Sequence, residues 1–296
     1  MKDSSKSLYY ALLAVLFWST VATAFKLTLL GMNLAQLLFY SSLTSVIVLF
    51  FFALKNSPKE LKRIFSKDQL PRNMLFGFIN PFIYYLILFK GYSLLPAQEA
   101  QPINLTWPLI LSILSVIFLQ QKISFKTIVG LIISFTGVVV IATRGDILSL
   151  HFHNLYGVLL CISSSFIWAG FWIVNLLDKR EESIKLFGAF LFGAIYSFIY
   201  IFFFDSFDPF EIKFIMGSVY IGLFEMGITF FVWLKALSLS DNKTKTSTIV
   251  YLFPVISLFL IAFVLGEKII ISSIVGLALI LGGILYQQLE QIKRST

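Results

Sequence analysis

One glutamate lies near the centre of a long apolar stretch of this sequence. Glu225 stands within GSVYIGLFEMGITFFVWLKAL, residues 217–237. An ionisable side chain in the middle of a membrane-spanning helix costs at least about 2.5 kcal/mol, so it normally faces a cavity or a partner. We expect Glu225 to bind a cationic or amino group or to carry a proton; the alternative is a buried glutamate with a structural role. Thr229 and Trp233 follow at helical spacing and extend the same face.

A second apolar stretch carries an asparagine and a proline together. Asn80 is followed by Pro81 and, one helical turn later, by Tyr84. Proline removes a backbone hydrogen bond, so Pro81 is expected to kink its helix and free a carbonyl group. Such a kink suits a binding site for which Asn80 and Tyr84 supply polar groups. Proline is also ordinary in membrane helices, and this alternative stays open.

Two further stretches are polar over half of their length. AQEAQPINLTWP, residues 97–108, contains the candidate binding residues Asn104 and Trp107. KTKTSTIVYLFP, residues 243–254, places Thr244, Thr248 and Tyr251 on one helical face. A lipid-facing helix does not carry so many polar groups. We expect these halves to form two access vestibules, one at each membrane face.

Tryptophans supply an aromatic surface. Trp18 lies deep in the first apolar stretch, and Trp168 and Trp172 lie one turn apart in a later one. The negative faces of such rings attract cations, so these residues are candidates for an aromatic box around a planar or cationic substrate. Filling apolar space is the commoner use of these side chains.

Two lysines occupy corresponding places. The pattern Lys-x-x-Ser-Leu begins at Lys90 and again at Lys235, each near the end of an apolar stretch. The two lysines are gating candidates, with simple snorkelling to the membrane interface as the alternative. Glu99 is expected to pair with Lys90 as part of a gate, unless the pair is solvated and energetically unimportant.

Helices that cross a bilayer are needed to position these residues. The chain is 58% hydrophobic and only 13% charged, against about 25% charged residues in soluble domains. Its apolar runs repeatedly reach the length of about 20 residues that spans a bilayer, without the alternation of barrel strands. The predicted fold is an all-α membrane protein with ten transmembrane helices, at about 8–29, 34–54, 73–95, 98–119, 124–143, 155–177, 184–204, 213–237, 246–265 and 270–289.

Lysine and arginine positions predict the orientation. With ten alternating spans, 17 of the 23 basic residues fall on the side of the N-terminus and 3 on the other side. The positive-inside rule then places both termini in the cytoplasm, and the expected location is the cytoplasmic (inner) membrane. The net charge of +8 is explained by this topology, and nucleic-acid binding is not expected.

An internal repeat divides the spans into two halves. The pattern KI-x4-IVG at residues 122–130 recurs at 268–276, and Asn80 corresponds to Glu225 at an offset of 145. The expected domains are 1–148 and 149–296, with five helices each and inverted relative to each other because five is odd. Inverted repeats are typical of secondary transporters, whose substrate site lies near mid-bilayer between the repeats.

Glycines mark the last helix of each half. Gly130 and Gly137, and correspondingly Gly276 and Gly283, are seven residues apart and share a helix face. Small residues allow helices to approach closely in lipid. These helices are expected to be packing or dimer elements, and the protein to be a monomer or a homodimer.

Several other chemistries find no support. His151 and His153 lie in a loop without a third ligand, so no metal site is expected. No zinc-protease, nucleophile-elbow or phosphate-loop motif is present, and no cofactor is expected. The single Cys161 excludes an intramolecular disulfide.

The sequence resembles the EamA family of the drug/metabolite transporter superfamily over essentially its whole length. The residues that carry this likeness are the Phe-Trp-Ser-Thr run at 17–20, answered by Ile-Trp-Ala at 167–169, and Gly266-Glu267-Lys268. The resemblance implies secondary transport by alternating access, with a cavity lined by the first four helices of each half. Gln120 and Gln121 stand where the second half has Gly and Glu, which puts a symmetric role for that glutamate in doubt.

The sequence therefore predicts a transporter, not an enzyme, for a small metabolite. Export of an amino acid or a related amine-bearing compound is favoured, because the deep charge is negative. Import of a polar or cationic metabolite is nearly as consistent, and an intramembrane enzyme acting on a lipid-linked substrate is a weaker rival. The expected partners are the small-molecule substrate and the lipid bilayer, with proton coupling through Glu225 as a further expectation.

Overall fold

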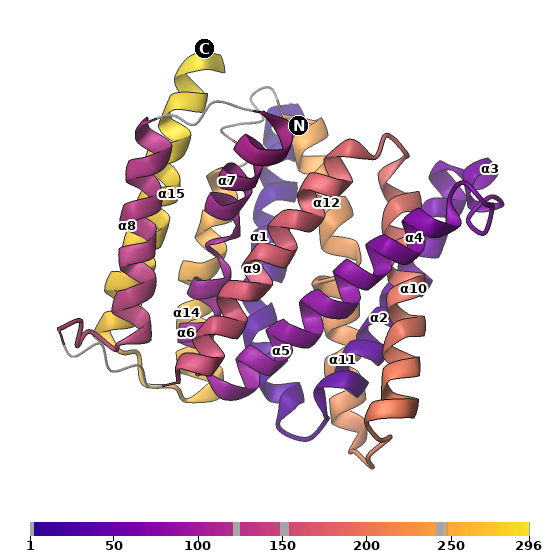
Figure 1. Cartoon of the computed structure of the whole chain (residues 1–296), viewed down its shortest axis with the longest axis horizontal. Helices are drawn as coiled ribbons and strands as arrows, with labels where there is room; N and C mark the ends of the chain where they lie inside the picture. Colours follow the sequence, from indigo (N-terminus) through magenta and orange to yellow (C-terminus); the bar gives the residue numbers. More distant parts are fainter. Residues whose placement is uncertain (1–2, 121–124, 149–153, 241–245, 247, 296) are drawn as a thin grey trace.

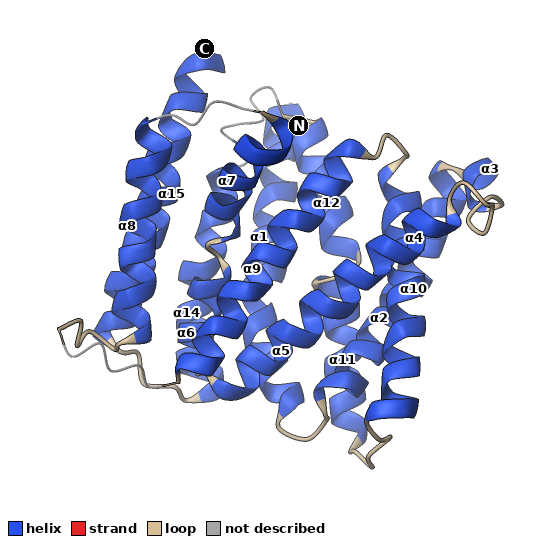
Figure 2. Ribbon diagram, viewed as in Figure 1, coloured by secondary structure: helices blue, strands red, loops and turns tan. Residues whose placement is uncertain are grey.

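The computed structural model describes residues 3–120, 125–148, 154–240, 246 and 248–295. Over these residues the chain is helical and contains no strand (Figure 2). The elements are α1 Asp3–Leu29, α2 Leu34–Asn56, α3 Pro58–Leu61, α4 Leu70–Gly77, the π-helix η1 Phe78–Ile83, α5 Tyr84–Leu94, α6 Ala97–Asn104, α7 Trp107–Leu119, α8 Phe125–Ala142, α9 Leu155–Leu177, α10 Glu182–Phe204, α11 Ile212–Phe224, α12 Ile228–Ser238, the 3-10 helix η2 Ile249–Leu252, α14 Phe253–Leu265 and α15 Ile271–Ser295.

Eight helical segments of the described chain are long and apolar enough to cross a membrane, and they correspond to the first eight predicted spans. The last two predicted spans fall on the shorter apolar helices Ile249–Leu265 and Ile271–Gln287. The all-helical membrane class is thus confirmed, while the count of ten spans stays a prediction.

The chain runs back and forth between two ends of the bundle. The two termini and α3 lie at one end, which we call the terminal face, and the connections after α1, α5, α8 and α10 lie at the other, which we call the opposite face (Figure 1). Side chains cap the N-termini of α2 and α9. Asn33 accepts a hydrogen bond from the Gln36 backbone N–H (2.8 Å), and Asn154 accepts one from the Gly157 backbone N–H (2.9 Å). These contacts satisfy N–H groups that the first helical turn leaves open.

Four of the predicted spans are not continuous α-helices. The third departs from helical dihedral angles at Asn80 (φ −145°, ψ 121°) within η1. The fourth is divided between α6 and α7 at Leu105 and Thr106, the eighth between α11 and α12 at residues 225–227, and the ninth begins as η2. Gln120 and Gly266, 146 residues apart, end α7 and α14 in the left-handed region (φ 53° and 67°). Non-helical backbone at this depth is tolerated where protein buries it or it lines a cavity.

Glycines join α8 to α15 at one side of the bundle (Figure 1). A Cβ atom added at Gly130 would lie 2.5 Å from the carbonyl oxygen of Gly283, and one added at Gly137 would lie 2.6 Å from that of Gly276. The predicted packing role is therefore confirmed. Because the glycine faces of the two helices meet each other, they are not free to join a second copy of the chain, and dimer formation by other surfaces stays a prediction.

The adjacent glycines of α15 provide a matched test. Gly283→Ala would drive a methyl group into Ser134 and the Gly130 carbonyl, whereas Gly282→Ala would meet nothing within 4 Å. Overpacking costs about 1–3 kcal/mol, so Gly283→Ala should lower the melting temperature of the purified protein by about 3–6 °C. Gly282→Ala should give a melting temperature equal to or slightly above that of the wild type, since alanine favours helix. Equal melting temperatures for the two variants would contradict this account of the α8–α15 contact.

Candidate functional site

The break between α11 and α12 exposes backbone groups beside Glu225. Glu225 follows the last residue of α11, and α12 begins only after Gly227, whose dihedral angles are φ −123° and ψ −95°. Ser45 of α2 donates to the carbonyl of Met226 (2.8 Å), and Thr229 donates to the carbonyl of Phe224 (2.5 Å). These hydroxyl groups satisfy carbonyls that a continuous helix would have satisfied itself. The half-buried Glu225 side chain thus has a fixed backbone position.

Tyr85 connects Glu225 to the first half of the chain. The Tyr85 hydroxyl donates to Glu225 Oε1 at 3.0 Å, and the Tyr85 side chain is fully buried on α5. The sequence predictions named the neighbouring Tyr84 and missed Tyr85. The departure from helical geometry at Asn80 changes which face of α5 its side chains occupy, and a regular helical period does not reveal this. A second tyrosine beside Tyr84 was the only signal in the sequence.

Aromatic rings from both halves of the chain pack next to one another, beginning at Tyr85 beside the Glu225 carboxylate. Tyr84 lies against Tyr85 (ring centroids 4.6 Å apart) and against Trp168 (4.7 Å). Trp168 in turn contacts Trp172 (6.0 Å), Trp107 (6.4 Å) and Phe230 of α12 (6.5 Å). The structure therefore brings together the predicted residues Tyr84, Trp107, Trp168 and Trp172. We call these four side chains with Tyr85 and Phe230 the aromatic cluster.

One amide side chain borders the aromatic cluster, and two other buried polar atoms of the region lack a partner within the described residues. Asn104, the last residue of α6, accepts from the Tyr84 hydroxyl (3.4 Å) and donates to Ser164 Oγ on α9 (2.9 Å). Asn80 is 1% exposed, and its Oδ1 has no hydrogen-bond partner among the described residues. The Trp172 indole N–H likewise has none within that part of the chain. A buried polar atom without a partner costs free energy, so Asn80 and Trp172 are available to a polar ligand.

Two predicted binding residues have other surroundings. Thr229 is fully buried, and its hydroxyl donates to the Phe224 carbonyl. The predicted polar stripe of Glu225, Thr229 and Trp233 along one helix face therefore does not form. The reason is that α12 starts after Glu225, which breaks the helical period. Trp233 instead lies 5.7 Å from Trp18 between ring centroids. Tyr251 lies in η2 and packs against the hydrophobic core. Thr244 of the same predicted vestibule lies outside the described residues.

The predicted gate between Lys90 and Glu99 needs correction. Glu99 on α6 pairs with Arg144, with 2.8 Å between Glu99 Oε1 and Arg144 Nε, and the Glu99 side chain is only 2% exposed. Arg144 follows α8 in a left-handed conformation (φ 50°) that brings it back over α6, which the sequence does not indicate. Lys90 and Lys235 are both exposed, as the snorkelling alternative expects.

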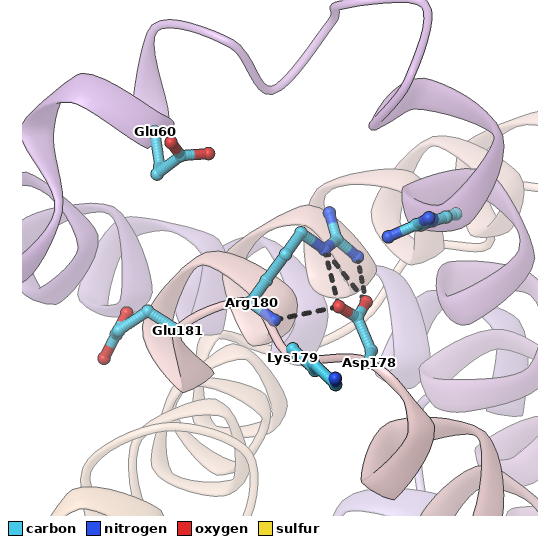
Figure 3. Close-up of a pocket in the computed structure, with 6 residues that line it drawn as sticks. Glu60, Asp178, Lys179, Arg180 and Glu181 are labelled. Carbon is cyan, nitrogen blue, oxygen red and sulfur yellow. Dashed lines mark hydrogen bonds and ion pairs between the residues drawn. The ribbon is translucent and has the colours of Figure 1, made fainter.

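A recess of about 400 Å³ opens at the terminal face (Figure 3). It is lined by Glu60, Arg72, Asp178, Lys179, Arg180 and Glu181. The Arg180 guanidinium closes on the Asp178 carboxylate at 2.7 Å and also donates to Asn73 Oδ1 on α4 at 2.7 Å (Figure 3 shows the pair). Acidic and basic groups balance here, so the recess ties α4 to the α9–α10 connection rather than offering one sign of charge to a ligand.

Metal chemistry finds no basis within the described residues, where no group of three His, Cys, Asp or Glu side chains is placed to hold an ion. His151 and His153 lie outside the described residues.

The chain is similar to known proteins over most of its length. The model of the EamA-like transporter family matches the chain twice, at residues 5–143 and 155–286. The chain is 27% identical over 279 residues to an "Uncharacterized transporter" of Archaeoglobus fulgidus, covering 92% of the chain and 95% of that protein. It is 26% identical over 222 residues to the "Uncharacterized transporter YvbV" of Bacillus subtilis, covering 74% and 72%.

A crystal structure with 20% sequence identity matches the fold over 99% of both chains, with a TM-score of 0.67. The apolar helices and the family match define an integral membrane protein of the transporter class. The chain belongs to the EamA-like transporter family, as its sequence resemblance predicted, and this family and its relatives' names point to a transporter and not to an enzyme.

The Asp178–Arg180 pair predicts a pH dependence of stability. Burial opposes ionisation of Asp178, but the hydrogen bonds and charge of Arg180 hold the pKa of this carboxyl below its usual range. A carboxyl with a lowered folded-state pKa stabilises fully above its unfolded value of about 3.9 and loses that contribution as the pH falls through the folded pKa. Asp178→Asn should therefore lower the melting temperature by about 2 °C at neutral pH.

The difference between wild type and Asp178→Asn should vanish as the pH falls from about 4 toward 2. Asp205→Asn, at an exposed aspartate of the opposite face, is the control and should change little. A difference for Asp178→Asn that persists in acid would show that the charge of Asp178 is not what stabilises this end of the bundle.

Proposed function

We propose that this protein is a secondary transporter that moves a small amine-bearing metabolite by alternating access, with Glu225 at the centre of its substrate site. The observation that carries the proposal is the hydrogen bond from Tyr85 to Glu225 at the break between α11 and α12. It joins a mid-span carboxylate of the second half to a tyrosine of the first half that belongs to the aromatic cluster. An uncompensated carboxylate at this depth is costly unless it serves a partner or a site.

The chemistry around Glu225 supports a cationic substrate group. A carboxylate beside several ring faces favours an ammonium ion through charge attraction and through the ring quadrupoles. Asn80 and Trp172 leave a buried acceptor and a buried donor for the polar remainder of an amino acid or a related amine. The same Glu225 also suits a proton carrier, in which case substrate and proton would compete for one carboxylate. Import uses the same site as export, and the favoured direction is export.

An inverted repeat with domains 1–148 and 149–296 is part of the proposal. The family model matches once in each half. The helical breaks at Asn80 and at residues 225–227 lie at or next to corresponding positions, and so do the left-handed caps at Gln120 and Gly266. Both termini lie at the end of the bundle that carries α3 and the α9–α10 connection, whose lysines and arginines support a cytoplasmic terminal face (Figure 1).

Substrate screening and transport by a Glu225 variant test the proposal together. Purified protein would be screened by thermal shift against amino acids, amines, nucleosides and sugars, and each hit tested by counterflow in proteoliposomes. An amine-bearing hit should be transported by the wild type, whereas Glu225→Gln should remain folded and lose at least about 90% of the transport, since it removes the charge.

Glu211→Gln is the matched control, because Glu211 is exposed and pairs with Lys213 on the surface. It should transport at the wild-type rate. Normal counterflow by Glu225→Gln would refute the assignment of the site. A bound substrate that never crosses the bilayer would refute transport itself.

A further inference from the structure

The connection between α5 and α6 is held by charged side chains from distant parts of the chain. α5 ends at Leu94 and α6 begins at Ala97, so the last carbonyls of one helix and the first N–H groups of the other meet at the opposite face. Lys26 of α1 donates from Nζ to the carbonyls of Tyr92 (2.8 Å) and Leu95 (2.9 Å). The cation therefore satisfies the end of α5 that carries partial negative charge.

Glu267 caps the N-terminus of α6, as Lys26 caps the C-terminus of α5. Its carboxylate, in the α14–α15 connection, accepts from the backbone N–H groups of Ala97 (2.9 Å) and Gln98 (3.3 Å). An anion at a helix N-terminus is favoured by the helix dipole, and hydrogen bonds to a charged acceptor are stronger than neutral ones. One turn of the chain is thus fixed by a cation on its carbonyl side and an anion on its N–H side.

Gln98 adds two hydrogen bonds between the halves. Its side-chain amide donates to the carbonyl of Lys268 (2.9 Å) and accepts from the N–H of Ile270 (3.0 Å). With the two bonds of Glu267, four hydrogen bonds join the start of α6 to the α14–α15 connection. We call Lys26, Gln98 and Glu267 the polar clamp.

The clamped helix leads directly to the candidate substrate site. α6 carries Gln98 at its first turn and Asn104 at its last, and Asn104 bonds to Tyr84 of the aromatic cluster. α6 is separated from α7 at Leu105 and Thr106, and such a short interruption is a place where the chain can change direction. The polar clamp therefore holds the short helix that lies between the site and the opposite face.

The carboxylate of the polar clamp has no acidic counterpart in the first half of the sequence. The residue 146 positions before Glu267 is Gln121, which is neutral. The repeated sequence therefore supplies an anion at one of the two corresponding positions and a neutral amide at the other.

We propose that the polar clamp is the closed gate of the opposite face, and that its hydrogen bonds must break before the site at Glu225 opens there. This inference rests on the proposed function, since a gate serves a site that opens alternately to the two faces. Its test needs no substrate, so it can fail or succeed independently of the transported compound.

The experiment compares cysteine labelling at the two faces. In a Cys161→Ser background, Gln101→Cys on α6 reports on the opposite face and Tyr251→Cys in η2 reports on the terminal face. Protein in lipid nanodiscs, accessible from both sides, would be labelled with a membrane-impermeant maleimide. Glu267→Gln should raise the labelling rate at Gln101→Cys by at least about tenfold, on the order of the loss of charge-assisted hydrogen bonds, and should lower the rate at Tyr251→Cys.

Two matched variants complete the design. Gln98→Ala keeps every charge but removes the two side-chain bonds, and should shift both rates in the same directions; it decides the matter if Glu267→Gln fails to fold. Glu211→Gln makes the same chemical change at an exposed glutamate of the α10–α11 connection and should alter neither rate.

Unchanged labelling at Gln101→Cys in both clamp variants would overturn the proposal. Faster labelling at both reporters would also overturn it, because a brace that only stabilises the fold loosens both ends when it is lost. Failure of the substrate site is separable: it appears as transport by Glu225→Gln and leaves the labelling pattern unaffected.

Discussion

The structure depends on one constraint: inside a membrane, every backbone N–H and C=O group must find a partner within the protein. Continuous helices satisfy this by themselves, but four of the predicted spans of this chain are interrupted. Each interruption creates backbone groups that side chains of neighbouring helices must satisfy. Ser45 serves the break beside Glu225. The same need arises at the turn between two spans, where Lys26 and Glu267 serve the end of α5 and the start of α6.

These interruptions also explain where the candidate chemistry lies. A regular helix presents side chains to its neighbours at a fixed period, whereas a break allows the chain to turn a side chain toward the centre. Glu225 follows the last residue of α11, Asn80 departs from helical geometry, and Asn104 ends α6. The continuous helices α8 and α15 pack against each other through glycine. Three polar residues of the candidate site therefore lie where the backbone is broken, while Trp168 and Trp172 lie on the continuous helix α9.

The two halves differ in their charges while resembling each other in their backbone. Left-handed caps end both α7 and α14, yet the residue after the cap is Gln121 in one half and Glu267 in the other. Similarly, Asn80 and Glu225 hold corresponding positions, but only the second carries a charge. In the proposed inverted repeat, the two faces of the bundle would correspond in backbone and differ in charge.

Several features could be predicted from the sequence: the helical membrane class from the length of apolar runs, the discontinuity near Pro81 from the restrictions of proline, and Glu225 as a candidate from the cost of a charge in lipid. The transporter family was predicted from a resemblance of the sequence. Three contacts became visible only in the folded chain: Tyr85 bonds to Glu225, Arg144 instead of Lys90 pairs with Glu99, and Glu267 caps α6. These contacts join residues 140, 45 and 170 positions apart. They depend on how each break redirects its helix, which no local pattern in the sequence encodes.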